Sequence, residues 1–357
     1  MAMWNGRMNS GMQTTKSLIL IGVILVLLPA GPLCAQKDPS AAADQALRSP
    51  QERLISEIGR LARLSGGVVG VSAVHIESQK RISFNGRERF PMASTYKIPI
   101  AVQLITLVER GELAWDRMVE IRETDLRPGS GVLAKLFDKP GLTVSLRNLF
   151  EIMMVVSDNT ATDLLLSIAG GPGAVTRQMR AVGIVDIDVS RSVFEMIAAS
   201  SGVRKLPPDA TPARFDRLER EADPGLKKKM KREFEADGRD TATPDAVVSL
   251  LQGIYRGDFL RPESAGMLLD AMRRSQTGEA RLKGMLPPGT PVAHKSGTLG
   301  GSTNDAGIIS LPEDGGHVAI AIFVKTSRKE ATEREKAIAE IARAVYDFYL
   351  FGCPESL

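Results

Sequence analysis

The spacing of hydrophobic and polar residues predicts distinct zones along this chain of 357 residues. Residues 49–66 repeat apolar positions at helical spacing, and Ser49 with Glu52 forms a capping box at the start. The next segments, GVVGVSAVHIES and KRISFNG, predict two strands joined by a tight turn. The fold therefore begins with a helix and a pair of strands.

Helical spacing dominates the middle of the chain, and strands return near its end. Thr143 and Thr243 are placed to cap two of these helices. Because strands lie at both ends, we expect an α/β fold in which one antiparallel sheet, built from N- and C-terminal strands and flanked by helices, carries an inserted all-helical lobe. The expected helices are 95–110, 144–154, 160–170, 171–183, 243–257, 261–274 and 329–350, and the returning strands are 291–297, 303–311 and 317–325.

The N-terminal residues predict an export signal. Residues 1–16 carry two basic residues and no acid, and the apolar run SLILIGVILVLLPAG follows them. This run is short for a membrane span, so we expect a signal peptide over 1–35, cleaved near Ala35, and a periplasmic or secreted protein. A retained membrane anchor is the alternative. We expect residues 36–48 to form a linker and residues 49–357 to form one folded domain.

Composition excludes several classes of function. The formal charge of +4 is too small to indicate nucleic-acid binding, and the basic run 227–232 sits among acidic residues, as on a solvated helix face. The run belongs to a charged insert at about 200–236 with two short helices.

His75, His294 and His317 lack metal-ligand spacing, so we expect no metal and no cofactor. If Cys34 leaves with the signal peptide, no internal disulfide can form.

Ser94 and Lys97 form the single Ser-x-x-Lys of the chain. Three residues apart on a helix, they share a face, so the Lys97 amine is expected near the Ser94 hydroxyl. Burial among apolar residues lowers the pKa of a lysine and lets its amine accept a proton. An incidental serine beside a snorkelling lysine is the alternative for so short a motif.

Two further polar groups interrupt apolar segments. Ser157, Asp158 and Asn159 separate two helical runs, where they either bind partners in a site or cap the second helix. Later, a strand reaches Lys295-Ser296-Gly297-Thr298. Its edge could bind a peptide-like substrate, with glycine allowing close approach and lysine attracting a carboxylate, or be an ordinary edge protected by lysine.

Together, Ser-x-x-Lys, Ser-Asp-Asn and Lys-Ser-Gly occur once each in this order, a set typical of class A β-lactamases and penicillin-binding proteins. The chain resembles class A serine β-lactamases over most of residues 49–350. The segments RERFPMASTYK, SDNTATDLLL, GRDTATP and KSGTLGGSTNDAGI all extend the resemblance.

The resemblance implies roles for these residues. Ser94 would be the acylated nucleophile, Lys97 would help to deprotonate it, and Ser157 would relay a proton to the leaving nitrogen with the help of Lys295. Backbone N–H groups of Ser94 and Thr298 would form the oxyanion hole. The residues implied in substrate binding are Asn159, Lys295, Ser296, Gly297 and Thr298.

Two departures from the family pattern stand out. Class A enzymes activate the deacylating water with a glutamate in a Glu-x-x-Leu-Asn pattern, for which the best candidate is Glu195. The asparagine is missing, and Glu195 is alternatively a surface charge of a helix. The region after the lysine motif also lacks the arginine that many members use for the substrate carboxylate. Lys325 is a possible substitute or a charge at a strand end.

Three functions are compatible with these residues. The first is a secreted, monomeric β-lactamase that hydrolyses penicillin- and cephalosporin-type antibiotics through an acyl-enzyme on Ser94. The second is a D,D-peptidase or related serine hydrolase that acts on peptidoglycan peptides. The third is a penicillin-binding protein without turnover. In all three a small molecule or peptide with a reactive amide is the partner.

Overall fold

The computed structural model describes residues 49–137, 139, 141–207 and 209–352. These residues belong to one of two units into which the chain divides, Arg48–Leu357. The signal peptide and linker expected over residues 1–48 lie outside the described residues, as does Cys353. Within the described ranges, no helix is both long and apolar enough to cross a membrane.

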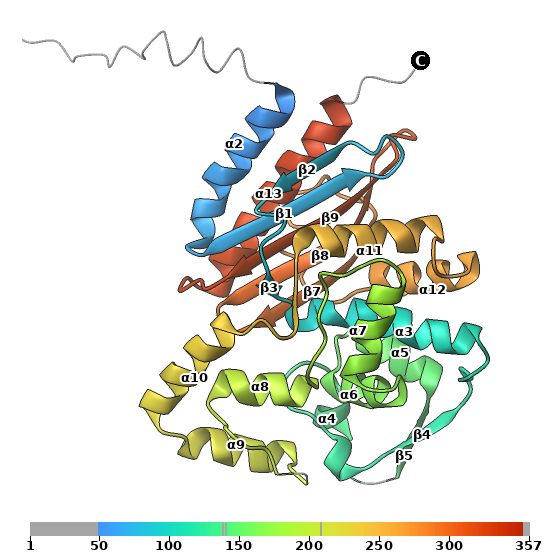
Figure 1. The fold of residues 1–357 in the computed structure, drawn as a ribbon, viewed down its shortest axis with the longest axis vertical. Helices are drawn as coiled ribbons and strands as arrows, with labels where there is room; N and C mark the ends of the chain where they lie inside the picture. The colour runs from blue at the N-terminus through green and yellow to red at the C-terminus, as the bar shows by residue number, and fades with distance from the viewer. Residues whose placement is uncertain (1–48, 138, 140, 208, 353–357) are drawn as a thin grey trace, which may run out of the picture. The chain divides into compact units, whose positions relative to one another are not determined.

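A five-stranded antiparallel sheet joins the two ends of the chain (Figure 1). The strand order is β2-β1-β9-β8-β7, so the N-terminal strand pair continues directly into the C-terminal strands. Two small two-stranded sheets pair β3 with β6 and β4 with β5. The strands are β1 (Val68–His75), β2 (Arg81–Phe84), β3 (Phe90–Pro91), β4 (Met118–Ile121), β5 (Leu142–Ser145), β6 (Thr241–Ala242), β7 (Val292–Leu299), β8 (Ser302–Ser310) and β9 (His317–Lys325).

Helices fill the chain between β3 and β7, as the sequence predicts, and also precede β1 and follow β9. The α-helices are α2 (Pro50–Ala62), α3 (Lys97–Glu109), α4 (Leu133–Leu136), α5 (Leu146–Val155), α6 (Asn159–Ile168), α7 (Pro172–Ala181), α8 (Val193–Ser201), α9 (Pro212–Glu221), α10 (Pro224–Ala236), α11 (Pro244–Arg256), α12 (Pro262–Arg273) and α13 (Ala331–Gly352). The 3₁₀ turns are η1 (Arg63–Ser65), η2 (Ala93–Tyr96) and η3 (Glu123–Asp125).

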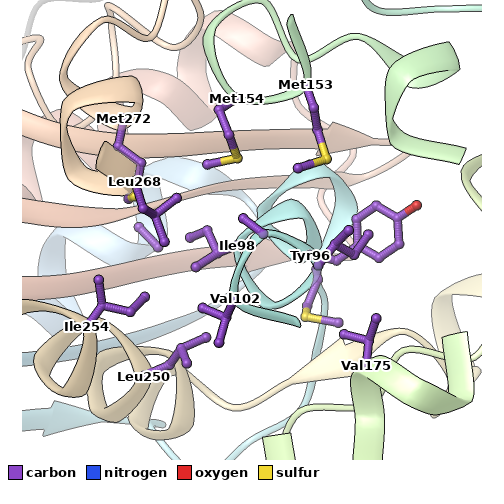
Figure 2. Close-up of a cluster of buried hydrophobic side chains, with 14 of the residues drawn as sticks. Tyr96, Ile98, Val102, Met153, Met154, Val175, Leu250, Ile254, Leu268 and Met272 are labelled. Atoms are coloured by element: carbon purple, nitrogen blue, oxygen red, sulfur yellow. The ribbon is translucent and has the colours of Figure 1, made fainter. Parts of the chain in front are cut away.

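Alternation along β9 separates two hydrophobic cores. Ile320 and Ile322 face a core that α2 and α13 cover, whereas Ala319, Ala321 and Phe323 face a larger core shared with the helical lobe. Helix α3 is buried on nearly every side within the larger core. Figure 2 shows part of that core, where side chains of α3, α5, α11 and α12 meet. The nucleophile motif at the start of α3 is therefore held rigidly between the sheet and the lobe.

The observed fold confirms the predicted class, and most of the predicted elements agree with it. The capping box of Ser49 and Glu52 is present at the start of α2. The predicted N-cap at Thr143 is wrong, because this residue pairs with Glu120 in the β4–β5 ladder. Helix α5 begins after Ser145, whose hydroxyl accepts the Asn148 N–H. The small sheet of β4 and β5 satisfies the backbone of Thr143, a tertiary pairing that local spacing cannot reveal.

The charged insert packs on the outer side of α8. Phe194 of α8 meets Phe215 of α9 with ring centroids 5.5 Å apart, and a small apolar core surrounds the pair. Helix α10 starts after Asp223, whose side chain accepts the Leu226 N–H, and its Phe234 lies under the Arg191 guanidinium. The insert therefore forms its own small core with α8, an arrangement that the sequence left undecided.

Candidate active site

The candidate nucleophile, Ser94, lies on a sharp turn between β3 and α3. Ala93 directly before it has a φ of +47°, a left-handed conformation that non-glycine residues seldom adopt. The buried Asn304 amide of β8 donates to the carbonyls of Pro91 and Met92, at 2.8 and 3.0 Å, and fixes the incoming segment. Ser94 remains partly exposed while its neighbours are buried. The turn therefore presents the serine at the surface of a rigid core.

Lys97, the first residue of α3, is completely buried. Its amine donates to the Ser157 carbonyl at 2.6 Å, to the Ser157 hydroxyl at 3.0 Å and to Asn159 Oδ1 at 3.1 Å. Among the described residues no hydrogen bond links it to Ser94 Oγ. The Ser-x-x-Lys and Ser-Asp-Asn motifs thus meet in one hydrogen-bonded cluster, with the lysine directed towards the second motif.

Ser157 lies between two lysine amines. The amine of Lys295, which is also completely buried, donates to the Ser157 hydroxyl at 3.0 Å and to the Ser296 carbonyl at 3.1 Å. Ser157 reaches this position with a φ of +59°. Asp158 beside it caps α6 by accepting the Ala161 N–H at 2.9 Å. The capping interpretation is therefore confirmed for Asp158, while Ser157 and Asn159 bind the Lys97 amine.

Burial sets the protonation of both lysines. Burial first, and then the positive charge of Lys295, hold the pKa of Lys97 well below its ordinary value. Burial lowers the pKa of Lys295 to about 7, with Asp305 opposing the shift. Because two ammonium groups that share one hydroxyl repel each other, the cluster favours a state in which Lys97 is the neutral amine. In that state the Ser157 hydroxyl donates to the Lys97 nitrogen instead of accepting from it.

Gly297 allows β7 to touch the Ser94 turn. A Cβ at this position would lie 2.8 Å from Ser94 N, 2.9 Å from Met92 O and 3.0 Å from Thr95 N, distances that real Cβ atoms scarcely tolerate. The close approach brings the backbone around Thr298 beside the backbone of Ser94. Glycine is thus required here for backbone contact, the condition for two N–H groups to converge on one oxygen.

These elements enclose a cavity of about 230 Å³. Two loop glycines shape its rim: Gly129 packs against Asn159, and Gly131 leaves space for the Asp158 carboxylate, which accepts the N–H groups of Val132 and Leu133. The residues that line the cavity are Ala93, Ser94, Tyr96, Gly129, Ser130, Asn159, Val193, Met196, Ile197, Thr298 and Leu299.

A protein-family comparison identifies the family of this chain. The model of the β-lactamase enzyme family matches residues 53–349. The chain belongs to the β-lactamase enzyme family. Among curated relatives, it is 27% identical to β-lactamase VEB-1 of Pseudomonas aeruginosa, covering 84% of this chain and 91% of that protein. It is also 28% identical to extended-spectrum β-lactamase PER-1 of the same organism, covering 79% of this chain and 82% of that protein.

Solved structures agree with this family. TLA-3 extended-spectrum β-lactamase superposes with a TM-score of 0.69 at 28% identity, covering 84% of this chain and 99% of that one. An ancestral class A β-lactamase superposes with a TM-score of 0.67 at 31% identity, covering 82% and 99%. The resemblance to class A serine β-lactamases inferred from the motifs is confirmed, and the chain is a serine hydrolase of this family.

The structure brings most of the predicted site residues together but leaves Glu195 apart. Glu195 is exposed, and its carboxylate accepts from the N–H and hydroxyl of Ser192 at 2.8 and 2.9 Å, which closes a capping box on α8. It lines a second cavity between α8 and α10, whereas Val193 and Ile197 face Ser94. The proposed role of Glu195 as deacylating base therefore finds no support in this geometry.

A positive charge behind β7 was missed in the sequence. The Arg281 guanidinium, which is almost fully buried, donates to Thr298 Oγ1 at 2.6 Å and to the Gly297 carbonyl at 3.0 Å. Lys325, considered as the substitute for a carboxylate-binding arginine, instead pairs with Glu88 at 2.9 Å and donates to the Arg89 carbonyl. It is a charge at a strand end, and the guanidinium next to Thr298 is that of Arg281, which also pairs with Glu335 at 3.0 Å.

Replacing Gly297 with alanine should disable acylation without unfolding the protein. The added Cβ would collide with the backbone of the Ser94 turn, and losing one oxyanion donor typically costs about a hundredfold or more in rate. Stopped-flow acylation by a chromogenic cephalosporin measures the loss, and circular dichroism checks the fold. Gly266→Ala, where a Cβ meets nothing within 4 Å, is the control and should acylate normally. Normal acylation by Gly297→Ala would contradict the assigned contact.

Proposed function

We propose that this enzyme is a secreted serine β-lactamase that opens the amide of penicillin- and cephalosporin-type antibiotics through an acyl-enzyme on Ser94. The observation that carries this proposal is the cluster in which one serine hydroxyl, that of Ser157, binds the amines of both Lys97 and Lys295 beside the Ser94 cavity. Such a cluster can move a proton from the nucleophile to the leaving nitrogen without any other base.

The chemistry follows from the protonation of the cluster. The neutral amine of Lys97 takes the proton as Ser94 Oγ attacks the lactam carbonyl carbon. The backbone N–H groups of Ser94 and Thr298 stabilise the oxygen that becomes negative. As the C–N bond breaks, the nitrogen takes a proton from the Ser157 hydroxyl, which Lys97 replenishes. Lys97 is then neutral again, and the acyl group is an ester of Ser94.

Substrate recognition uses the other wall of the cavity. Asn159 lines the cavity, and its side-chain carbonyl is held by Lys97 while its amide donates to the Pro128 carbonyl at 2.8 Å. We assign Asn159 to the amide side chain of the substrate. The Ser296 hydroxyl, Thr298 and the charge of Lys295 bind its carboxylate, and Arg281, itself paired with Glu335, holds the Thr298 hydroxyl in place.

Export completes the proposed function. We infer that residues 1–35 direct the chain to the periplasm or the medium, and that residues 49–357 work there as a monomeric catalytic domain after the linker 36–48. The apolar run without acidic residues supports this. The intact mass of the exported protein should correspond to cleavage near Ala35, and a mass that retains residues 1–35 would favour a membrane anchor.

Ser94→Ala should abolish turnover. The wild type is expected to hydrolyse many equivalents of a chromogenic cephalosporin, because Ser94 is the nucleophile in the cavity, while the variant should show no covalent adduct in intact-mass spectra. Ser130→Ala, which alters another serine of the cavity wall, controls for loss of a hydroxyl and should still form the adduct. An adduct on Ser94→Ala would refute the assignment, and turnover of D-Ala-D-Ala peptides instead of β-lactams would favour a peptidase.

The affinity for a substrate carboxylate should fall as the pH rises through about 7. The Lys295 amine has a pKa of about 7, so it is charged below this pH and neutral above it. Losing this positive charge weakens the binding of the carboxylate by about tenfold or more. Equilibrium binding of benzylpenicillin to the unreactive Ser94→Ala variant, from pH 5.5 to 9, measures this change. The methyl ester of the same penicillin is the control, and an equal pH dependence of acid and ester would contradict the role of Lys295.

A further inference from the structure

A cavity of about 430 Å³ lies on the face of α8 that is turned away from Ser94, and we call it the outer cavity. Helix α8 supplies one wall through Ala198 and Ala199, and α10 supplies another through Met230 and Phe234. The two helices pack against each other (Figure 1). Among the described residues, none lines both this cavity and the Ser94 cavity. The volume is within the range of small-molecule sites, so the outer cavity can hold a ligand of its own.

Close contacts hold α10 against α8 on either side of the outer cavity. Gly202 ends α8 with a φ of +88°, and a Cβ there would lie 2.9 Å from Lys227 Cα of α10. Near the other end of α10, the Arg191 guanidinium lies 5.3 Å from the centre of the Phe234 ring and pairs with Asp237 at 3.2 Å. The cavity is therefore preformed, and a ligand can enter it without first separating the helices.

The interior of the outer cavity suits an aromatic group. Aliphatic side chains from α8 and from the loop after it lie opposite a thioether and a phenyl ring from α10. Both a thioether and a phenyl ring make favourable contacts with an aromatic ring. The apolar residues of the lining are Ala198, Ala199, Val203, Leu206, Met230 and Phe234.

Two positive charges of the lining have no protein partner. Arg204 and Lys205 are exposed, and within the described ranges neither side chain forms a hydrogen bond or an ion pair. Both follow α8 directly in the chain, so their charges belong to the same part of the cavity wall. An anionic group of a ligand can therefore bind there without displacing an existing pair.

The acidic residues of the lining, in contrast, are already engaged. Each carboxylate accepts from a backbone N–H or pairs with a basic side chain. The contacts are Glu195 with Ser192 at 2.8 Å, Glu233 with Lys229 at 3.7 Å, and Asp237 with Arg191 at 3.2 Å and with Arg239 at 2.7 Å. A cationic ligand would have to compete for these carboxylates, so the charges of the outer cavity favour an anion.

We propose that the outer cavity binds a small organic anion with an aromatic body and one carboxylate or sulfonate group. The aromatic body packs between α8 and α10 against Met230 and Phe234, and the anionic group lies beside Arg204 and Lys205. This site goes beyond the proposed hydrolysis, because no residue of the Ser94 cavity takes part in it.

The fluorescent dye anilinonaphthalene sulfonate tests this site, because it combines an aromatic body with a single sulfonate. Fluorescence titration of the purified protein should give saturable binding of one dye per chain. The double variant Arg204→Gln/Lys205→Gln should raise the Kd about fivefold or more, since two partly exposed charge contacts are lost. Phenylnaphthylamine, which has the same aromatic body without the sulfonate, should bind wild type and this variant with a Kd equal within about twofold.

Matched variants show where the dye binds. Lys228→Gln/Arg232→Gln removes two exposed charges of α10 that do not line the outer cavity, and it should leave the Kd within about twofold of wild type. Ala199→Phe adds a ring to the cavity wall and should weaken the binding of both dyes, with circular dichroism as the check on its fold. Ser94→Ala should bind both dyes like wild type, whether or not this serine is acylated by β-lactams.

Three results would overturn the proposal. The first is a wild type without saturable binding of the sulfonate dye. The second is equal weakening by the two double variants, which would show a general attraction between the dye and a basic surface. The third is an unchanged Kd in a folded Ala199→Phe variant, which would place the dye outside the outer cavity.

Discussion

Two buried lysine amines that share one serine hydroxyl are the constraint around which this site is built. An ammonium group without polar partners is costly to bury, so each amine must be given acceptors by fixed parts of the fold. Lys97 receives them from the motif at the start of α6, and Lys295 receives them from Ser157 and from its own strand. This requirement ties α3, α6 and β7 together, and the positive φ of Ser157 is its local consequence.

The proposed acylation residues and the apolar wall of the cavity lie in different parts of the structure. The nucleophile and both lysines come from η2, α3 and β7, whereas α8 supplies the opposite wall of the cavity. Helix α8 lies in the segment of residues 191–240. The two ends of this segment are joined by a buried ion pair, with 2.5 Å between Arg191 Nε and Asp240 Oδ2. Because the segment is held at both ends and has its own small core, its cavity-facing residues can change while the cluster of Lys97, Ser157 and Lys295 stays intact.

The sequence predicts those features that depend on residues close together in the chain. Helix caps such as Ser49 and Thr243 follow from residues within one turn, and the motifs around Ser94 and Lys295 are recognised from their order and spacing along the chain. The missed features depend on contacts between distant segments. The Arg281 guanidinium donates to Thr298, which lies 17 residues further along the chain on β7. A local sequence pattern cannot predict such a contact, because it depends on how a loop packs against a strand.

Glu195 shows the limit of sequence spacing most clearly. Its distance along the chain from Ser157 is suitable for a deacylating base, but a helix turns each residue by about 100°, so one or two positions decide which side chain reaches the cavity. The capping box with Ser192 fixes α8 so that Glu195 faces away and Val193 faces in. The helix face that lines the Ser94 cavity is therefore apolar, and the carboxylate that the spacing favours lies on another face of α8.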